Sequence, residues 1–203
     1  MKVIDNIKAK IKEKREKYFG DELPIEKKLY YTTCVLGIVS SFSGFLSSTF
    51  GGALKIGIVV NFLIFLFVTA ICIYGFIVED SYKGSIYLCL VLNFLIFPLM
   101  FFFTGGMKSG TVIYFVLGTF LSGILLRGIV RAAISRIIIV WYVVIIKISY
   151  DYPILVFNVS DEVKLRFIIT SFVMTSLFIY YTTKIFIKSY VKNQRTIAEL
   201  KKS

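Results

Sequence analysis

The chain has no histidine, and its 203 residues include only three cysteines and three prolines. Without histidine, the commonest general base, the commonest metal ligand and any phospho-accepting histidine are missing from this chain. Cys34, Cys72 and Cys89 are far apart and form no Cys-x-x-Cys pair, so we expect them to be small packing residues. We therefore predict neither a metal nor a cofactor.

Acidic residues are missing from every long uncharged stretch of the chain. Proton-coupled pumps and cation exchangers usually need an acid inside the membrane, so these functions are poor candidates. The sequence also lacks the HExxH, GxSxG and Walker-loop patterns of common hydrolases and nucleotide-binding enzymes. We expect that this chain is not an enzyme.

Hydrophobic residues make up 57% of the chain, and the mean hydropathy is +0.80. A soluble domain of this size could not bury so much apolar surface. Six apolar stretches could each cross a bilayer as a helix: Leu29–Leu54, Ile56–Val78, Gly84–Met107, Ser109–Leu126, Ile137–Ile146 and Phe167–Thr183. We expect the fifth helix to start near Gly128 and the sixth to extend past Lys184, whose long stem can snorkel. The predicted fold is all-α: a polytopic membrane protein with six transmembrane helices over residues 29–189.

The positive charges alternate between the two sides of these six stretches. Nine lie in residues 1–28, one at Lys83, three from Arg127 to Arg136 and six from Lys184 onward, so 19 of the 24 share one side. The other side has Lys55, Lys108, Lys147, Lys164 and Arg166. The positive-inside rule places the richer side, and both termini, in the cytoplasm of a bacterial plasma membrane. The net charge of +12 then reflects topology and contact with anionic lipid, and we predict the lipid bilayer rather than nucleic acid as partner.

Residues 1–28 are predicted to form a cytoplasmic basic leader. Isoleucines and a tyrosine recur at helical spacing over residues 1–19, lysines occupy much of the remainder, and Gly20 and Pro24 end the pattern. Three interpretations are open: an amphipathic helix lying on the inner leaflet, a coiled-coil arm pairing with a second subunit, or a solvated basic segment.

At the other terminus the helical pattern does not stop with the sixth span. Lys184, Lys188 and Lys192 recur every four residues, and no glycine or proline follows them. We expect residues 190–203 to be the start of a cytoplasmic coupling helix, through which two copies could form a homodimer. The alternative is a frayed basic tail.

Special residues are concentrated between Asn93 and Gly118. Pro98 removes a backbone donor, so we expect a kink in the third span. Three glycines permit positive φ angles in a compact turn, which either presents backbone amides to an anion or is a tight hairpin. The candidate residues are Asn93, Phe97, Pro98, Gly105, Gly106, Lys108, Ser109 and Gly110.

A second candidate cluster follows the fifth span. It consists of Tyr150, Asp151, Tyr152 and Pro153. Tyrosines at a membrane boundary are usually interface anchors. Asp151 lies beside Lys147 and could pair with it, and a role of this cluster in ligand contact is the other interpretation.

Two further patterns concern helix packing. Asn61 and Asn93 lie deep in the second and third spans, where each is expected to form a hydrogen bond to a neighbouring helix. One face of the first span carries only small residues: Gly37, Ser40, Ser41, Gly44 and Ser48. Such a face is typical of close helix packing.

The pattern N-x3-FP-x4-F-TGG-x-KSG-x4-F-x-LG from Asn93 to Gly118, with the later Tyr150–Pro153 and the final span, resembles a bacterial module. It is the multi-span N-terminal sensor region of clostridial-type sensor histidine kinases and diguanylate cyclases. The resemblance covers about Tyr82 to Lys202. In that family the last span runs into a signalling helix and then a kinase or GGDEF output domain. This chain holds neither output sequence before Ser203, so the resemblance implies the membrane input half, with a cytoplasmic output domain or kinase as partner.

Three functions follow from these observations. The first is a sensor module that relays an outer or intramembrane cue through the last helix. The second is the substrate-binding subunit of an energy-coupling-factor-type importer, because such subunits are also basic and six-spanned at this size. The third is an accessory integral membrane protein without a ligand.

Overall fold

The structure is a computed structural model that describes residues 18, 20, 23–50, 55–78 and 80–200. Within these residues it contains helices and no strand. The elements are α2 (Ile25–Phe50), α3 (Lys55–Val78), α4 (Ser81–Val91), the π turn η1 (Leu92–Ile96), α5 (Phe97–Phe103), the 3-10 turn η2 (Gly106–Ser109), α6 (Ile113–Leu125), α7 (Gly128–Asp151), the 3-10 turn η3 (Pro153–Leu155) and α8 (Asp161–Leu200). The predicted amphipathic helix over residues 1–19 lies outside the described residues, apart from Tyr18.

Five helices of the described part are long and apolar enough to cross a membrane: α2, α3, the continuous α4–η1–α5, α7 and α8. The chain is therefore a multi-pass membrane protein, as its composition predicts. The fourth predicted span, residues 109–126, is different. Its helix, α6, has only 13 residues, which corresponds to about 20 Å and is shorter than a bilayer core of about 30 Å. The first residues of the fourth predicted span belong instead to the glycine-rich turn that precedes α6.

The last two long helices begin at Gly128 and at Asp161. α7 starts at Gly128, as expected, and Gly128 has a φ of 53°. α8 starts at Asp161, before the apolar stretch that begins at Phe167. Asp161 and Glu162 lie in its first turn and pair with Lys164 and Arg166, and acidic residues at a helix start are favoured by the helix dipole.

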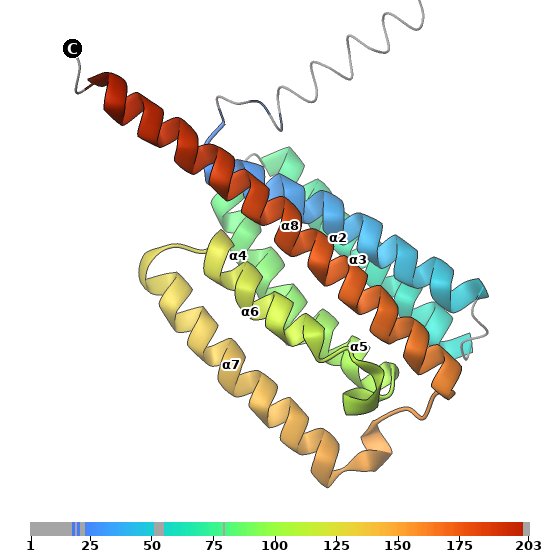
Figure 1. Ribbon diagram of the computed structural model, residues 1–203. Helices are drawn as coiled ribbons and strands as arrows, with labels where there is room; N and C mark the ends of the chain where they lie inside the picture. The colour runs from blue at the N-terminus through green and yellow to red at the C-terminus, as the bar shows by residue number, and fades with distance from the viewer. Residues whose placement is uncertain (1–17, 19, 21–22, 51–54, 79, 201–203) are drawn as a thin grey trace, which may run out of the picture.

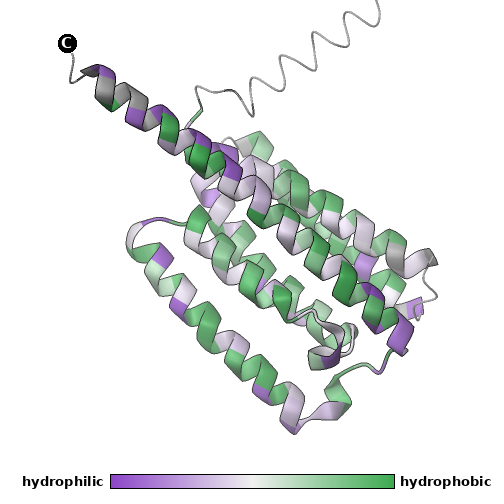
Figure 2. Cartoon of the chain, viewed as in Figure 1, coloured by the Kyte–Doolittle hydropathy of each residue, from purple (hydrophilic) through white to green (hydrophobic). Residues whose placement is uncertain are grey.

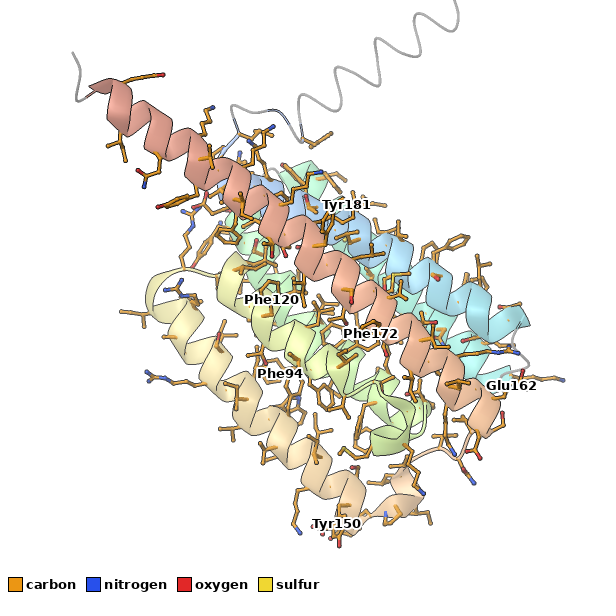
Figure 3. The ribbon with its side chains drawn as sticks, viewed as in Figure 1. Phe94, Phe120, Tyr150, Glu162, Phe172 and Tyr181 are labelled. Atoms are coloured by element: carbon orange, nitrogen blue, oxygen red, sulfur yellow. The ribbon has the colours of Figure 1, made fainter. Side chains whose placement is uncertain are left out.

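The helices pack around α2, which contacts α3, α8, α4 and α6. α7 lies at the edge of the bundle, against α6 and η1 (Figure 1). Apolar residues cover the length of the bundle, and polar residues gather at its ends and along the last part of α8 (Figure 2). Large apolar side chains are exposed on this outer surface, for example Leu63, Val116, Val143 and Phe172. Phe172 and Tyr181 both belong to α8 (Figure 3). This distribution suits a bundle surrounded by lipid.

The two ends of the bundle differ. α2 begins and α8 ends at the same end (Figure 1), which we call the basic end because Lys27, Lys28, Lys83, Arg127 and Arg131 lie there. There an ion pair of 2.8 Å joins Arg127 to Glu26 of α2. Asp80 caps α4 by accepting the Lys83 N–H at 3.1 Å, and this bond holds the pKa of its carboxyl below the usual value. The opposite end, with η2 and residues 152–160, is the turn end.

Tyr30 fastens three helices together near the basic end. Its side chain is fully buried and lies between Gly75 of α3 and Gly84 of α4. A Cβ atom added at Gly75 would lie 1.6 Å from the Tyr30 hydroxyl, and one at Gly84 would lie 2.7 Å from it. The neighbouring Tyr31 stacks on Phe76 at 5.0 Å between ring centroids. The ring of Tyr30 fits only because both facing positions are glycine.

We expect Gly75→Ala to lower the free energy of unfolding by about 1–3 kcal/mol, because its methyl group overpacks the Tyr30 slot. Thermal unfolding in detergent measures the effect. Gly123→Ala is the matched control, since a Cβ at Gly123 of α6 meets nothing within 4 Å. Equal melting temperatures for the two variants would contradict the role of the slot.

Candidate functional site

A buried hydrogen-bond network joins three helical segments at Asn93. The Asn93 side-chain amide donates to the Cys89 carbonyl at 2.7 Å and to Ser122 Oγ at 3.3 Å. The Tyr142 hydroxyl of α7 donates to Asn93 Oδ1. Ser122 of α6 donates in turn to the Gly118 carbonyl at 2.9 Å. The expected interhelical bonding of Asn93 is thus present, and it connects η1, α6 and α7.

Asn93 reaches these partners from an irregular turn next to Pro98. Pro98 lies in the first turn of α5 and has no N–H, so it cannot donate to the Phe94 carbonyl as an α-helix requires. The chain widens here into η1, where the Phe97 N–H donates to the Leu92 carbonyl. The structure has a π turn directly before Pro98, in the span where a kink was predicted.

Gly118 of α6 makes room for this network. A Cβ atom there would lie 2.1 Å from Asn93 Oδ1 and 2.5 Å from the Tyr142 hydroxyl. Aromatic stacking closes the sides, with Phe115 on Tyr142 at 4.1 Å between centroids. Gly118 belongs to the sequence pattern described above, whereas Tyr142 and Ser122 do not. Nothing in the spacing of the apolar α7 indicates that Tyr142 faces an asparagine.

The glycine-rich turn has the conformation that its sequence predicts. Gly105, Gly106 and Gly110 have φ angles of 106°, 59° and 70°. Inside the turn, the hydroxyls of Thr104, Ser109 and Thr111 lie 2.8–3.1 Å from one another. Ser109 also donates to the Gly106 carbonyl at 2.8 Å, and Thr104 to the Met100 carbonyl at 2.7 Å. The turn is therefore held by its own buried hydroxyls.

The turn is also covered by the segment that precedes α8. A Cβ atom at Gly106 would lie 3.1 Å from Val156, and one at Gly105 would lie 3.3 Å from Val159. The Phe157 N–H donates to the Phe102 carbonyl at 2.9 Å, and Phe157 stacks on Phe103. Because Gly105, Gly106 and Ser109 are buried while Met107 and Lys108 are exposed, the geometry favours the tight hairpin over an open anion-binding loop.

The second predicted cluster lies at the same end of the bundle but on its surface. Tyr150 and Asp151 end α7, and Tyr150 is 81% exposed (Figure 3). Asp151 accepts from Lys147 at 2.8 Å, as predicted. Tyr152 and Pro153 lead into η3 and are exposed. The residues that cover the glycine-rich turn, Val156–Val159, follow this cluster in the chain.

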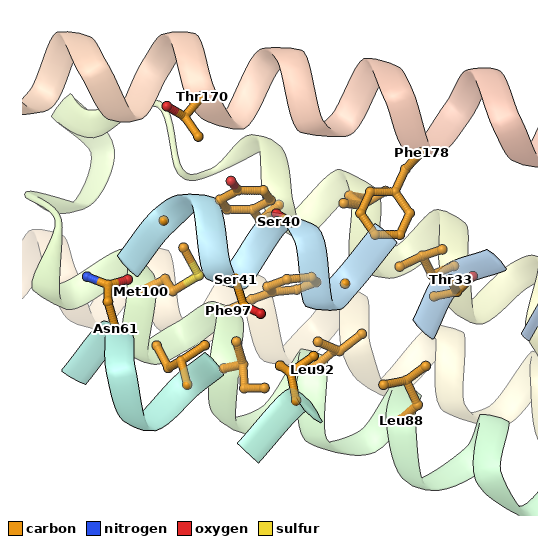
Figure 4. Close-up of a pocket in the computed structure, with 18 of the residues that line it drawn as sticks. Thr33, Ser40, Ser41, Asn61, Leu88, Leu92, Phe97, Met100, Thr170 and Phe178 are labelled. Atoms are coloured by element: carbon orange, nitrogen blue, oxygen red, sulfur yellow. The ribbon is translucent and has the colours of Figure 1, made fainter. Parts of the chain in front are cut away.

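A cavity that the sequence did not predict lies in the centre of the bundle (Figure 4). The small residues of α2 were expected to pack closely, but four of them line this cavity: Gly37, Ser40, Ser41 and Gly44. A Cβ atom at Gly37 would lie 3.5 Å from Val68 and one at Gly44 would lie 3.8 Å from Asn61 Oδ1, so α3 is in van der Waals contact with part of this face. Ser48 of this face accepts the interhelical bond expected of Asn61, at 2.9 Å.

The three cysteines are consistent with packing roles. All three cysteines are buried and free, as expected, and the Cys72 thiol lies 3.7 Å from the Cys34 carbonyl. No group of three or more histidine, cysteine, aspartate or glutamate side chains comes together in the part of the chain that the structure describes. The cavity, the Asn93 network and the covered turn are therefore the features that carry the functional argument.

We expect Tyr142→Phe to destabilise the bundle by about 1 kcal/mol, because it removes the hydroxyl that donates to Asn93. Gly118→Ala should cost more, about 1–3 kcal/mol, since its methyl group must displace both network partners. Thermal unfolding of both variants in the same detergent measures this order, with Gly123→Ala on the same helix as control. A Tyr142→Phe variant as stable as the wild type would show that the network contributes nothing.

Comparison with known proteins gives no relative. No family model, no curated protein and no solved structure matches the chain. The resemblance to the sensor regions of histidine kinases and diguanylate cyclases therefore stays a prediction that rests on its motif residues. The class that the fold establishes is a multi-pass membrane protein, all-helical over its described residues, with five helices of spanning length.

Proposed function

We propose that the chain is a membrane input module that transmits a conformational change along α8 to a cytoplasmic partner. The observation that supports this most directly is the continuity of α8, which has 40 residues without a break and so extends over about 60 Å. It starts at the turn end, packs along α2 and α6, and projects past the basic end (Figure 1). A rigid element that touches both ends is what a displacement-based relay requires.

The input contact of this relay is between the glycine-rich turn and α8. A Cβ atom at Gly110 would lie 2.6 Å from Ile168 Cγ1 and 3.2 Å from its Cα, so the two backbones approach closely here. Lys164 of the same helix lies beside Gly105. A cue that repositions the turn would therefore act directly on the first turns of α8. A relay also needs two packed states with different affinity for the cue.

The proposed orientation puts the basic end in the cytoplasm of a bacterial plasma membrane. Three of the five basic residues assigned to the outer side have an acid partner within the first or last turns of a helix. These are Lys147 with Asp151, Lys164 with Asp161 and Arg166 with Glu162. Such pairing lowers the net positive charge of the turn end and is consistent with its outer location.

The projecting part of α8 is also the proposed contact between two copies. Ile187, Tyr190 and Ile197 are exposed there, and their spacing of three and seven residues is that of a coiled-coil seam. Gln194 occupies the remaining seam position. Pairing through this seam would place the cytoplasmic output partners of two copies side by side.

An importer subunit that captures a small substrate is the second candidate, and the central cavity is the observation that favours it. The two functions predict different protein complexes. Stable co-purification with ATPase subunits would support the importer, and homodimers linked through α8 would support the input module.

The dimer prediction is tested by single cysteines on the projecting helix. We expect Ile187→Cys and Ile197→Cys to form disulfide-linked dimers in oxidised membranes, because both lie on the seam. Lys192→Cys is the control on another face of the helix. Equal linkage at all three positions, or linkage at none, would contradict a specific seam.

The relay prediction is tested with a diguanylate cyclase domain fused after Ser203, whose activity depends on how two copies pair. We expect Gly110→Ala to change the cyclase rate severalfold, because a side chain at a φ of 70° that also meets Ile168 must shift the turn against α8. Asp151→Asn should have little effect, since Asp151 contacts Lys147 at the surface. Unchanged cyclase activity in a folded Gly110→Ala fusion would argue against the relay.

A further inference from the structure

α7 has an exposed stripe with a cation at each end. The stripe consists of Arg136, Val140, Val143 and Lys147. Its members are four, three and four residues apart, so they share one side of the helix, and all of them are exposed. The buried residues of α7 lie on another side: Ile138, Tyr142, Ile145 and Ser149. Because α7 lies at the edge of the bundle (Figure 1), we call this stripe the outer stripe of α7.

The two cations of the outer stripe are close together for a helix that crosses a membrane. Arg136 and Lys147 are eleven residues apart, which corresponds to about 17 Å along the helix, whereas the hydrocarbon core of a bilayer is about 30 Å thick. In α3, by contrast, no charge follows Lys55 in a helix of 24 residues, which is about 36 Å long. The outer stripe therefore matches an ordinary bilayer only if both charged side chains extend fully toward opposite membrane surfaces.

Lys147 does extend toward the turn end. Its ammonium group lies 2.8 Å from Asp151, one helical turn nearer that end, and 5.6 Å from the ring centroid of Tyr150. Tyrosine is enriched at the level of lipid headgroups, so these residues mark where the polar region begins at the end of α7. The remaining shortfall in length is at Arg136.

An ion pair fixes the depth of Arg136 in the bundle. Arg127, directly before α7, pairs at 2.8 Å with Glu26 in the first turn of α2, so the two helices begin at the same level of the basic end (Figure 1). Arg136 is nine residues further along, about 14 Å from that level. The uncharged stretch of α2 begins already at Leu29. Arg136 therefore lies at the depth of apolar residues of α2 and not beyond the end of the bundle.

Arg136 has no acidic partner among the described residues. An exposed guanidinium at this depth is costly, and snorkelling together with local thinning of the bilayer reduces the cost. α6, which packs beside α7, is also short, with 13 residues. The two neighbouring helices thus both favour a thinner bilayer on their side of the bundle than α3 does.

We propose that the bilayer is locally thinned beside α6 and α7, where the phosphate of a phospholipid in the basic-end leaflet moves inward to Arg136. Guanidinium binds phosphate through two parallel hydrogen bonds, so the headgroup supplies the missing counter-charge. A lipid fits the whole outer stripe, because its acyl chain covers Val140 and Val143 while its phosphate pairs with Arg136. This surface does not include α8, so the proposal stands or falls independently of the relay.

Trp141 allows a test without any label on the protein. It is the only tryptophan of the chain and lies on α7 between the two cations. The full chain is reconstituted in dioleoylphosphatidylcholine nanodiscs that contain a phospholipid spin-labelled either near the headgroup or near the end of the acyl chain. We expect Arg136→Leu to reduce the quenching of Trp141 by the headgroup-proximal label about twofold, because headgroups are no longer drawn inward. Quenching by the chain-end label should not decrease.

Two variants show whether the charge at this depth is responsible. Arg131→Leu is the matched control, since it removes an exposed arginine from the first turn of the same helix and should leave the quenching as in the wild type. Arg136→Lys keeps the charge and should also resemble the wild type. Equal quenching in the wild type and Arg136→Leu would overturn the proposal. Absence of quenching by either label would show that a second copy, rather than lipid, covers α7, and would overturn it as well.

Thermal unfolding gives a second result that does not depend on the surroundings of Trp141. The same variants are compared in nanodiscs of dimyristoyl- and dierucoylphosphatidylcholine, which form a thin and a thick bilayer. We expect the melting temperature of the wild type to fall by several degrees more than that of Arg136→Leu on going from the thin to the thick bilayer, because the thick bilayer buries the guanidinium more deeply. The same fall in both proteins would contradict a thinned bilayer at this surface.

Discussion

The missing backbone N–H of Pro98 is the constraint on which one half of this bundle depends. Within a membrane-spanning helix the freed carbonyl of the preceding turn cannot turn to water, and the chain responds with the π turn η1. That turn carries Asn93, whose amide bonds to Ser122 and accepts from Tyr142. The irregular turn is thereby hydrogen-bonded to both α6 and α7.

The same requirement for paired polar groups explains why the glycine-rich turn is built as it is. α6 has 13 residues, fewer than the roughly 20 of a full span, and the turn before it is packed into the end of the bundle. A buried turn must satisfy its polar groups locally, and the hydroxyls of Thr104, Ser109 and Thr111 do so. The cover formed by Val156 and Val159 then needs glycine beneath it, because a larger residue would push the two segments apart.

The sequence was sufficient to predict the helices that depend on apolar length and charge, and insufficient where the partner is distant. The membrane class, the start of α7 at Gly128 and the positive φ angles of Gly105, Gly106 and Gly110 all follow from local composition. The short α6 was missed because an uncharged run does not show where a turn ends. Tyr142 was missed since its partner is 49 residues away in the chain.

The small-residue face of α2 has a second property that the sequence did not indicate, because part of it packs on α3 and part of it lines the cavity. Glycine and serine permit close approach, but they also leave space when the opposite helices are held elsewhere. Here Tyr30 fixes α2 against α3 and α4 near one end, and Ser48 bonds to Asn61 near the other. The cavity lies between these two contacts, along residues 33–44 of α2.

One turn of α8 connects this cavity with the glycine-rich turn. Ile168 meets Gly110, whereas Phe167 and Thr170 line the cavity. The two features lie on different faces of the same short stretch of α8, so the turn and the cavity wall contact one helix. Because α8 has no glycine or proline from Asp161 to Leu200, it has no residue at which a local bend is expected, and the proposed displacement at the turn would move the helix as a unit.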